Sequence, residues 1–166
     1  HTPGIDAVGE VIESNSSDFK TGEKIIVTGY DLGMNTFGGF GQYISIPANW
    51  AIPLPKELSE AEAMSIGTAG LTAGLCVRKL LMNDFTPDSG NVLVTGASGG
   101  VGSVAVMVLS KLGFKVVALT GKKDQADYLE SLGASSVIMR SEMEEQGKPL
   151  QRGIYQGGVD TVGGNI

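Results

Sequence analysis

A run of glycines between residues 96 and 102 carries the chain's strongest signal for chemistry. It reads Gly-Ala-Ser-Gly-Gly-Val-Gly, and the spacing of a G-x-G-x-x-G turn falls on residues 97, 99 and 102, with alanine in place of the first glycine. In such a turn glycine lets the backbone approach a pyrophosphate, and free amides at the start of the following helix point at the phosphates. We therefore predict a dinucleotide site that includes these residues of the turn: Ser98, Gly99, Gly100, Val101 and Gly102.

The residues after the next apolar run indicate which dinucleotide would bind. NAD-binding units usually place Asp or Glu at the end of the second strand, where it accepts hydrogen bonds from the ribose 2′-hydroxyl. This chain has Thr120, Gly121 and Lys122 there, and its first acid, Asp124, comes too late. Because a carboxylate would repel a 2′-phosphate whereas Thr and Lys can bind one, we predict NADPH as the cofactor. Arg140, after the third apolar run, is a second candidate for the same phosphate.

Short apolar runs alternate with helical segments around these candidates. We expect helices over residues 101–112 and 123–132, each ended by a glycine, and strands over residues 92–94, 115–119, 136–139 and 158–162. This alternation predicts an α/β fold, namely part of a doubly wound parallel sheet of the Rossmann type. Since the complete fold would need two more strands, we expect the chain to be the middle of a longer protein.

The first 57 residues have a different pattern, that of short strands joined by turns. Strands are expected over residues 7–13, 23–28 and 42–46, the last from the alternation Gln-Tyr-Ile-Ser-Ile. Ser59 then caps a helix, and a second helix is expected over residues 68–82. We therefore predict two domains. Residues 1–57 form part of a β domain, and residues 58–166 hold linker helices and the first part of the dinucleotide-binding domain.

Composition and charge narrow the class of partner. The net charge of −6 provides no basic field for nucleic acid or anionic lipid. The sequence contains no apolar run of about 18 residues, which is the length that would predict a membrane span. Cys76 is the one cysteine, which excludes a disulfide framework, and we expect a reduced, cytoplasmic location. His1 is the one histidine, and a single terminal histidine makes no zinc site.

Several motifs together resemble the medium-chain dehydrogenase/reductase superfamily, over essentially the whole chain. They are Pro-Gly-Ile-Asp-Ala-Val-Gly at residues 3–9, Gly-Gly-Phe-Gly-Gln-Tyr at residues 38–43, and the glycine turn itself. Ile-Gly-Thr-Ala-Gly-Leu-Thr-Ala at residues 66–73 and Val-Asp-Thr-Val-Gly-Gly at residues 159–164 resemble the quinone oxidoreductase subfamily, which includes the acryloyl-CoA reductases. The resemblance implies a GroES-like β domain and a Rossmann domain.

The resemblance also implies an activity, namely hydride transfer from NADPH to an electron-poor C=C bond such as that of acryloyl-CoA. A quinone or enone reductase and a non-enzymatic NADPH-binding protein are the alternatives. Thr72 matches a threonine that lies near the nicotinamide in relatives. Zinc alcohol dehydrogenases carry Gly-His-Glu where this chain has Gly4, Ile5 and Asp6, and because Ile5 cannot ligate a metal we expect zinc-independent chemistry. Catalytic residues are left unassigned, and we expect a homodimer with a small-molecule substrate.

Overall fold

The structure is a computed structural model that describes residues 2–143 and 153–164. Its contacts divide the chain into two compact units, His1–Thr68 and Ala69–Ile166, which are described separately below. This division is drawn from contacts within each unit, and it places the start of the predicted linker helices, up to Thr68, in the first unit. The predicted domain boundary after residue 57 therefore stays a prediction.

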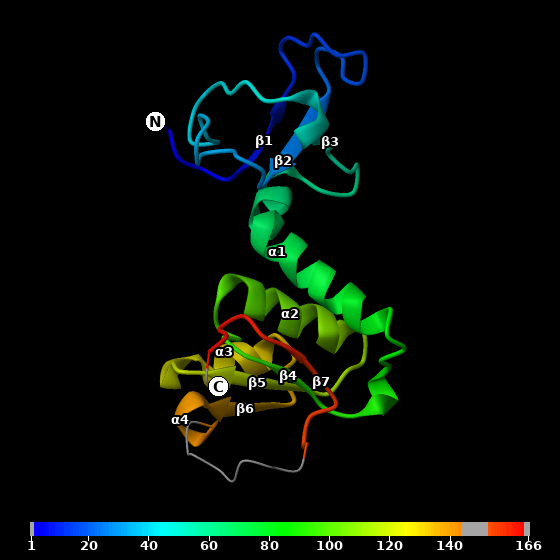
Figure 1. The fold of residues 1–166 in the computed structure, drawn as a ribbon, viewed down its shortest axis with the longest axis vertical. Coiled ribbons are helices and arrows are strands. Elements are labelled where there is room, and N and C mark those ends of the chain that lie inside the picture. Colours follow the sequence, from blue (N-terminus) through cyan, green and yellow to red (C-terminus); the bar gives the residue numbers. More distant parts are fainter. Residues whose placement is uncertain (1, 144–152, 165–166) are drawn as a thin grey trace. The chain divides into compact units, whose positions relative to one another are not determined.

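The first unit contains a small antiparallel sheet with the strand order β1-β2-β3 (Figure 1). Strand β1 (Asp6–Glu10) pairs with β2 (Lys24–Thr28), and β2 pairs in turn with β3 (Ala51–Pro53), which follows the 3-10 helix η1 (Ala48–Trp50). The sequence predicted β1 and β2, although β1 ends earlier than residue 13. Val11 still exchanges backbone hydrogen bonds with Glu23 and Gly22, at 2.9 and 2.8 Å, but the regular strand ends at Glu10.

The strand expected over residues 42–46 is absent, so that prediction was wrong. These residues have no regular structure. Their alternation of apolar and polar side chains has the period of a strand, but a strand also needs a neighbouring strand for its hydrogen bonds. The amides just before this segment, from Gly38 to Phe40, bond instead to carbonyls of residues 2–4. Alternation alone does not say whether a partner strand lies alongside.

Helix α1 (Glu60–Leu81) begins with a capping box. The amide of Glu62 donates to Ser59 Oγ at 3.2 Å, and the amide of Ser59 donates to the Glu62 carboxylate at 2.8 Å. The Ser59 hydroxyl and amide hold the pKa of Glu62 below its usual value, because both donate hydrogen bonds to the charged carboxylate. The prediction that Ser59 caps a helix is confirmed.

The helix breaks at Gly67, where φ is 48° and ψ is −158°. This break matches the two successive helices that the sequence predicts. After the break, the carboxylate of Asp6 accepts hydrogen bonds from the amide of Thr68 at 3.1 Å and from its hydroxyl at 2.8 Å. A side chain at position 67 would meet this carboxylate, since a Cβ placed there would lie 2.8 Å from Asp6 Oδ2. The break therefore requires glycine on two grounds, its positive φ and the close carboxylate.

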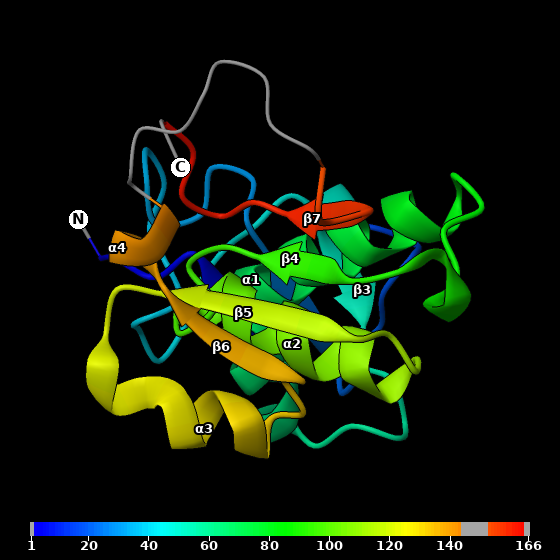
Figure 2. The same cartoon turned by 90° about the horizontal axis from the view of Figure 1, so that it is seen from below.

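The second unit is a parallel sheet with the strand order β6-β5-β4-β7 (Figures 1 and 2). Its strands are β4 (Val92–Val94), β5 (Val116–Thr120), β6 (Ser136–Met139) and β7 (Gly157–Val159). The helical segments between them are η2 (Pro87–Ser89), α2 (Gly100–Lys111), η3 (Lys123–Gln125), α3 (Ala126–Ser131) and α4 (Arg140–Met143). The predicted α/β fold with part of a Rossmann sheet is confirmed.

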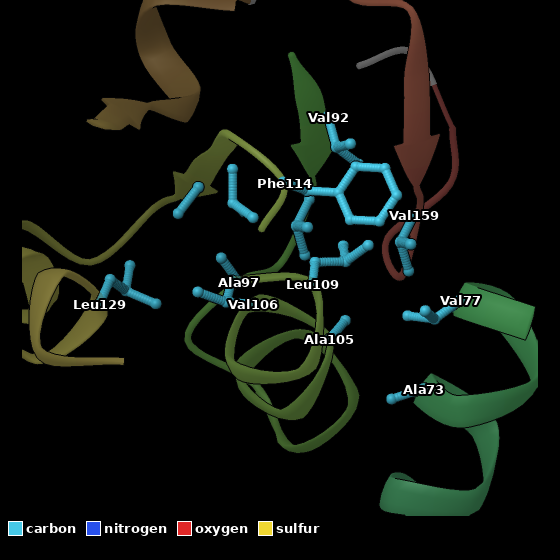
Figure 3. Packing of buried hydrophobic residues seen from close by; sticks show 13 residues of the cluster. Ala73, Val77, Val92, Ala97, Ala105, Val106, Leu109, Phe114, Leu129 and Val159 are labelled. Carbon is cyan, nitrogen blue, oxygen red and sulfur yellow. The ribbon is translucent and has the colours of Figure 1, made fainter. Parts of the chain in front are cut away.

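The core of this unit lies between the sheet and its helices. Figure 3 labels Leu109 and Val106 on α2 and Val92 on β4, with Val77 of α1 near Val159 of β7, as members of one cluster. These five side chains are at most 3% exposed. Burial of one such aliphatic side chain contributes about 1.5–3 kcal/mol, so this cluster fixes helix α2 against the strand that precedes it.

The spatial order of the four described strands differs from their order in the sequence. Strands β4, β5 and β6 follow one another outward, and β7 then pairs with the free side of β4. The strand order therefore reverses between β4 and β7. In open α/β sheets ligands bind beyond the carboxyl ends of the strands at such a switch point.

Candidate cofactor site

The loops that follow the four parallel strands meet at one edge of the sheet, because parallel strands place their carboxyl ends together. The glycine turn follows β4, the segment from Thr120 to Lys122 follows β5, Arg140 follows β6 and Asp160 follows β7. All candidate residues for the cofactor except Thr72 therefore come from this edge.

Backbone hydrogen bonds fix the glycine turn to its neighbours. The amide of Ala97 donates to the carbonyl of Leu119 in β5 at 3.0 Å, and the amide of Gly99 donates to the carbonyl of Gly96 at 2.8 Å. A Cβ on Gly102 would meet the backbone of Ala97, with 2.7 Å to its Cα. Position 102 therefore needs glycine for the approach of α2 to the turn.

The start of helix α2 leaves amides for a ligand. The amide of Ser103 is the first to donate back into the turn, to the carbonyl of Gly99 at 2.9 Å. The amides of Gly100, Val101 and Gly102 precede it at the helix start, where no intrahelical acceptor is in reach. Such an end carries partial positive charge and attracts anions.

Ser98 and Thr120 join the turn to the end of β5 by their hydroxyl groups. The two oxygens lie 2.9 Å apart, and the amide of Lys122 donates to Thr120 Oγ1 at 3.1 Å. Thr120 is only 2% exposed, whereas Ser98 is half-buried. The hydroxyl of Thr120 is therefore engaged inside the protein, on the turn side of the strand end.

Arg140 lies against the loop that follows β5. A Cβ on Gly121 would lie 3.5 Å from the guanidinium carbon of Arg140. Lys122 and Arg140 both have exposed side chains, so two cations flank a glycine that leaves the backbone open. No acid stands at the end of β5, and the arrangement suits an anionic group better than a hydroxyl pair.

Thr72 lies on α1, one turn after Ala69. The Cβ of Ala69 would be 3.3 Å from a Cβ on Gly100, so this part of α1 runs beside the start of α2. Residues three apart share one side of a helix, so Thr72 lies on the same side of α1 as Ala69, the side next to the start of α2.

Asp160 and Thr95 form a polar cluster that the sequence reasoning did not single out. The hydroxyl of Thr95 donates to the carboxylate of Asp160, which also accepts from the amides of Val162 and Gly163 at 3.1 Å each. These donors, the Thr95 hydroxyl first, hold the pKa of Asp160 below its usual value. The bonds to the next amides also end β7 at Val159 rather than residue 162. An acid directly after a buried strand is the signal that could have revealed the cluster.

Thr161 belongs to the same cluster, because it donates two hydrogen bonds to Thr95. Its amide donates to Thr95 Oγ1 at 2.9 Å, and its hydroxyl donates to the carbonyl of Thr95 at 2.8 Å. Thr95 is 6% exposed and leads directly into the glycine turn. A side chain at Gly96 would strike Thr161. The loop after β7 is therefore held by hydrogen bonds to Thr95, the residue that precedes the glycine turn.

Two further properties concern metals and membranes. Within residues 2–143 and 153–164, no three His, Cys, Asp or Glu side chains gather as metal ligands would. His1 lies outside the described residues. In the same ranges no helix is both long and apolar enough to cross a bilayer.

Comparison with known proteins identifies the class to which this fold and site belong. Residues 1–56 match the family model of the alcohol dehydrogenase GroES-like domain. The yhdH oxidoreductase of Salmonella enterica, solved in complex with NADP, has a TM-score of 0.95 and 44% identity over 98% of this chain. The chain belongs to the medium-chain dehydrogenase/reductase superfamily.

Two relatives indicate the branch. Acrylyl-CoA reductase AcuI of Ruegeria pomeroyi is 47% identical over 99% of this chain. YhfP of Bacillus subtilis, provisionally named a quinone oxidoreductase, is 50% identical over 97% of this chain, and its structure with NAD bound has a TM-score of 0.93. The resemblance to the quinone oxidoreductase branch is thus confirmed. The chain spans about half the length of these relatives, 49% of YhfP and 50% of AcuI.

Proposed function

We propose that the full-length protein is an NADPH-dependent, zinc-independent oxidoreductase that transfers hydride to an activated C=C bond such as that of acryloyl-CoA. The observation that carries the proposal is the pair of cations, Lys122 and Arg140, beside Gly121 at a strand end without an acid. The identity to acrylyl-CoA reductase supports the class of substrate.

The residues at the sheet edge fit a bound NADPH. Gly99 and Gly100 expose bare backbone at the helix start, where Ser98, Val101 and Gly102 complete a cradle for the pyrophosphate. Lys122 and Arg140 would hold the 2′-phosphate over Gly121, and Thr72 is our candidate for a contact with the nicotinamide end. When bound, the cofactor would supply the hydride, while the protein supplies binding, orientation and electrostatic stabilisation.

Chemistry without zinc places a demand on the protein. Charge that develops on the thioester oxygen during reduction must be stabilised, and hydrogen-bond donors can do this in place of a metal. Ile5 stands at the position of a zinc ligand and carries no donor atom. Elemental analysis of the dialysed full-length protein should therefore find no stoichiometric zinc. One zinc per chain, with activity lost to a chelator, would contradict this part of the proposal.

The substrate is tested by NADPH oxidation in three parallel assays, with acryloyl-CoA, with a quinone and without added substrate. We expect the highest kcat/KM with acryloyl-CoA. A higher value with the quinone would favour the second candidate, quinone reduction, which the identity to YhfP supports. Tight NADPH binding without oxidation in any assay would indicate a binding protein instead.

The glycine turn is tested by Gly99→Val. The φ of Gly99 is −85°, and an added Cβ meets only the carbonyl oxygen of Gly96, at 3.2 Å. We therefore expect the fold to survive and NADPH binding to be lost, because the branched side chain would occupy the place of the pyrophosphate. Gly9→Val is the matched control, since a Cβ in that part of β1 meets nothing within 4 Å. Unchanged affinity in Gly99→Val by calorimetry would remove the turn from the site.

We further propose a cytoplasmic homodimer that binds a small-molecule substrate. The single cysteine supports this location, because it allows no disulfide framework within the chain. Light scattering of the full-length protein tests the oligomeric state, and a monomer at micromolar concentration would contradict it.

A further inference from the structure

Thr120 has a role that its position at a strand end does not by itself reveal. We infer that Thr120 is a positioning residue, whose buried hydroxyl turns the Ser98 proton toward a bound phosphate and ties the pyrophosphate turn to the 2′-phosphate loop. The inference rests on the proposed binding of NADPH, and it assigns Thr120 no direct contact with the cofactor.

The donors and acceptors around Thr120 fix the direction of its hydrogen bonds. A hydroxyl group has one proton to donate and two lone pairs to accept with. Thr120 Oγ1 accepts the amide proton of Lys122 at 3.1 Å. Among the described residues, Ser98 Oγ at 2.9 Å is the acceptor in reach of the Thr120 proton.

Burial decides between the two possible directions of the hydroxyl pair. If Ser98 donated to Thr120, the proton of Thr120 would be left without an acceptor at a site that is 2% exposed. A buried donor without a partner costs about 1–3 kcal/mol. Thr120 therefore donates to Ser98, and the chain of hydrogen bonds runs from the Lys122 amide through Thr120 to Ser98.

This direction leaves the proton of Ser98 for a ligand. Ser98 is half-buried and belongs to the glycine turn, two residues before the amides that begin α2. Its hydroxyl then adds a donor to the glycine turn, whereas the opposite direction would present lone pairs to an anion. Because each hydrogen bond in such a series polarises the next, an anion at the turn strengthens all of the hydrogen bonds in the series.

The same series of hydrogen bonds joins two parts of the proposed site. The Lys122 amide belongs to the loop that would hold the 2′-phosphate, and Ser98 belongs to the turn that would hold the pyrophosphate. NADPH and NADH share the pyrophosphate, so loss of the Thr120 hydroxyl should weaken both cofactors. The loss should be larger for NADPH, because the Lys122 loop also loses its anchor.

The experiment uses the full-length protein and the isosteric variant Thr120→Val. By calorimetry we expect its affinity to fall about five- to tenfold for NADH and further for NADPH. Thr120→Ser retains the hydroxyl and should restore both affinities to within about twofold. Amide hydrogen exchange at Lys122 in the cofactor-free protein should be faster in Thr120→Val and normal in Thr120→Ser.

A double-mutant cycle separates positioning from mere stability. Ser98→Ala should weaken NADPH binding in the wild type and much less in the Thr120→Val background, because the two hydroxyls act in one chain. Thr86→Val is the matched control. It also removes one hydroxyl of a Thr–Ser pair, Thr86 and Ser89 at 3.2 Å, but before β4 at the opposite edge of the sheet. Its cofactor affinities should not change.

The outcomes distinguish the inference from the proposed function. Wild-type protein that binds neither cofactor would overturn the proposed function, and the inference with it. Wild-type binding together with unchanged affinities in Thr120→Val would overturn the inference alone. Additive effects of Ser98→Ala and Thr120→Val, or a loss that Thr120→Ser does not restore, would also overturn it.

Discussion

The two units of the chain bury their apolar side chains to very different extents. In the described part of the second unit, thirteen side chains from α1, α2, α3, the sheet and its connections form one buried cluster (Figure 3). In the first unit, aromatic side chains between residues 30 and 43 are 63–77% exposed: Tyr30, Phe37, Phe40 and Tyr43. Among the described residues, most of the buried apolar side chains thus belong to the second unit. In its described part, the first unit buries only Val11, Ile26, Val27, Leu32 and Ala63.

This difference shows where the local sequence is sufficient to predict a strand. A buried parallel strand is apolar along most of its length, and β5 is buried at all five positions with Thr120 as its one polar residue. Such a strand is recognisable without knowledge of its neighbours. A half-buried strand is recognised only by alternation, and alternation without a partner strand gave the wrong prediction at residues 42–46.

The largest expected effect is on the core of the second unit. Leu109→Ala removes a fully buried side chain from the cluster, and we expect it to lower the free energy of unfolding by about 3–4 kcal/mol. Urea denaturation of the full-length protein measures the loss, and hydrogen exchange resolved by segment locates it. Leu32→Ala, at a fully buried leucine of the first unit, should cost less, about 2 kcal/mol, because that unit has few other buried apolar side chains. Equal costs would remove the contrast between the units.

The next effect concerns the cations of the second unit. Lys122→Ala should weaken NADPH about ten- to a hundredfold and NADH much less, because a charge-assisted hydrogen bond contributes roughly 1.5–3 kcal/mol. Arg140→Ala should act in the same direction. The measurement is the ratio of the two dissociation constants. Lys24→Ala is the control in the first unit, where Lys24 pairs with Glu60 at 2.8 Å. A ratio within about twofold of the wild type in both site variants would leave the cofactor preference unexplained.

A smaller effect is expected at the start of α1. Ser59→Ala removes the hydroxyl of the capping box and should lower the free energy of unfolding by about 1 kcal/mol. Exchange should increase in the first turn of α1 and remain unchanged in the sheet of the second unit. An increase across that sheet would mean that the two units unfold as one, which contradicts a separate core.

The smallest effect depends on pH and concerns the cluster around Asp160. Its pKa is lowered in the folded state, chiefly by the Thr95 hydroxyl, so its charged form stabilises the fold above the unfolded pKa of about 4. This stabilisation is lost as the pH falls through the lower, folded pKa. Asp160→Asn should therefore be less stable than the wild type at pH 7, and the difference should shrink below about pH 4. A difference that does not vary with pH would assign the effect to packing. Because Asp160 is exposed, the effect should be modest.

Much of the second unit could be predicted because its signals are local. The strand over Ser136–Met139 has the predicted bounds, and glycines end the helices before β5 and β6 as expected. The bounds of β7 could not be predicted, because they depend on hydrogen bonds that Asp160 makes with residues beyond the strand. A pattern of residue types contains no such information.

The sequence proposed residues for the site, but it did not predict the hydrogen bonds between them. The sequence brought Thr120 and Lys122 together as contacts for one phosphate. It could not tell which side of the strand end Thr120 faces, because a strand that is buried throughout has no polar face to orient it. The structure places that hydroxyl against Ser98, and this contact is what motivates the positioning role.

The pairing of β4 with β7 has a consequence for synthesis on the ribosome. Thr95 and Asp160, at the ends of these strands, are 65 residues apart in the chain. At about 5–20 residues per second, β7 is translated roughly 3–13 s after β4. Helix α2 can close on β4 and β5 long before that, since local contacts form within microseconds to milliseconds. During this interval the open edge of β4 is a template for other nascent chains, and the late arrival of β7 and Asp160 ends that exposure.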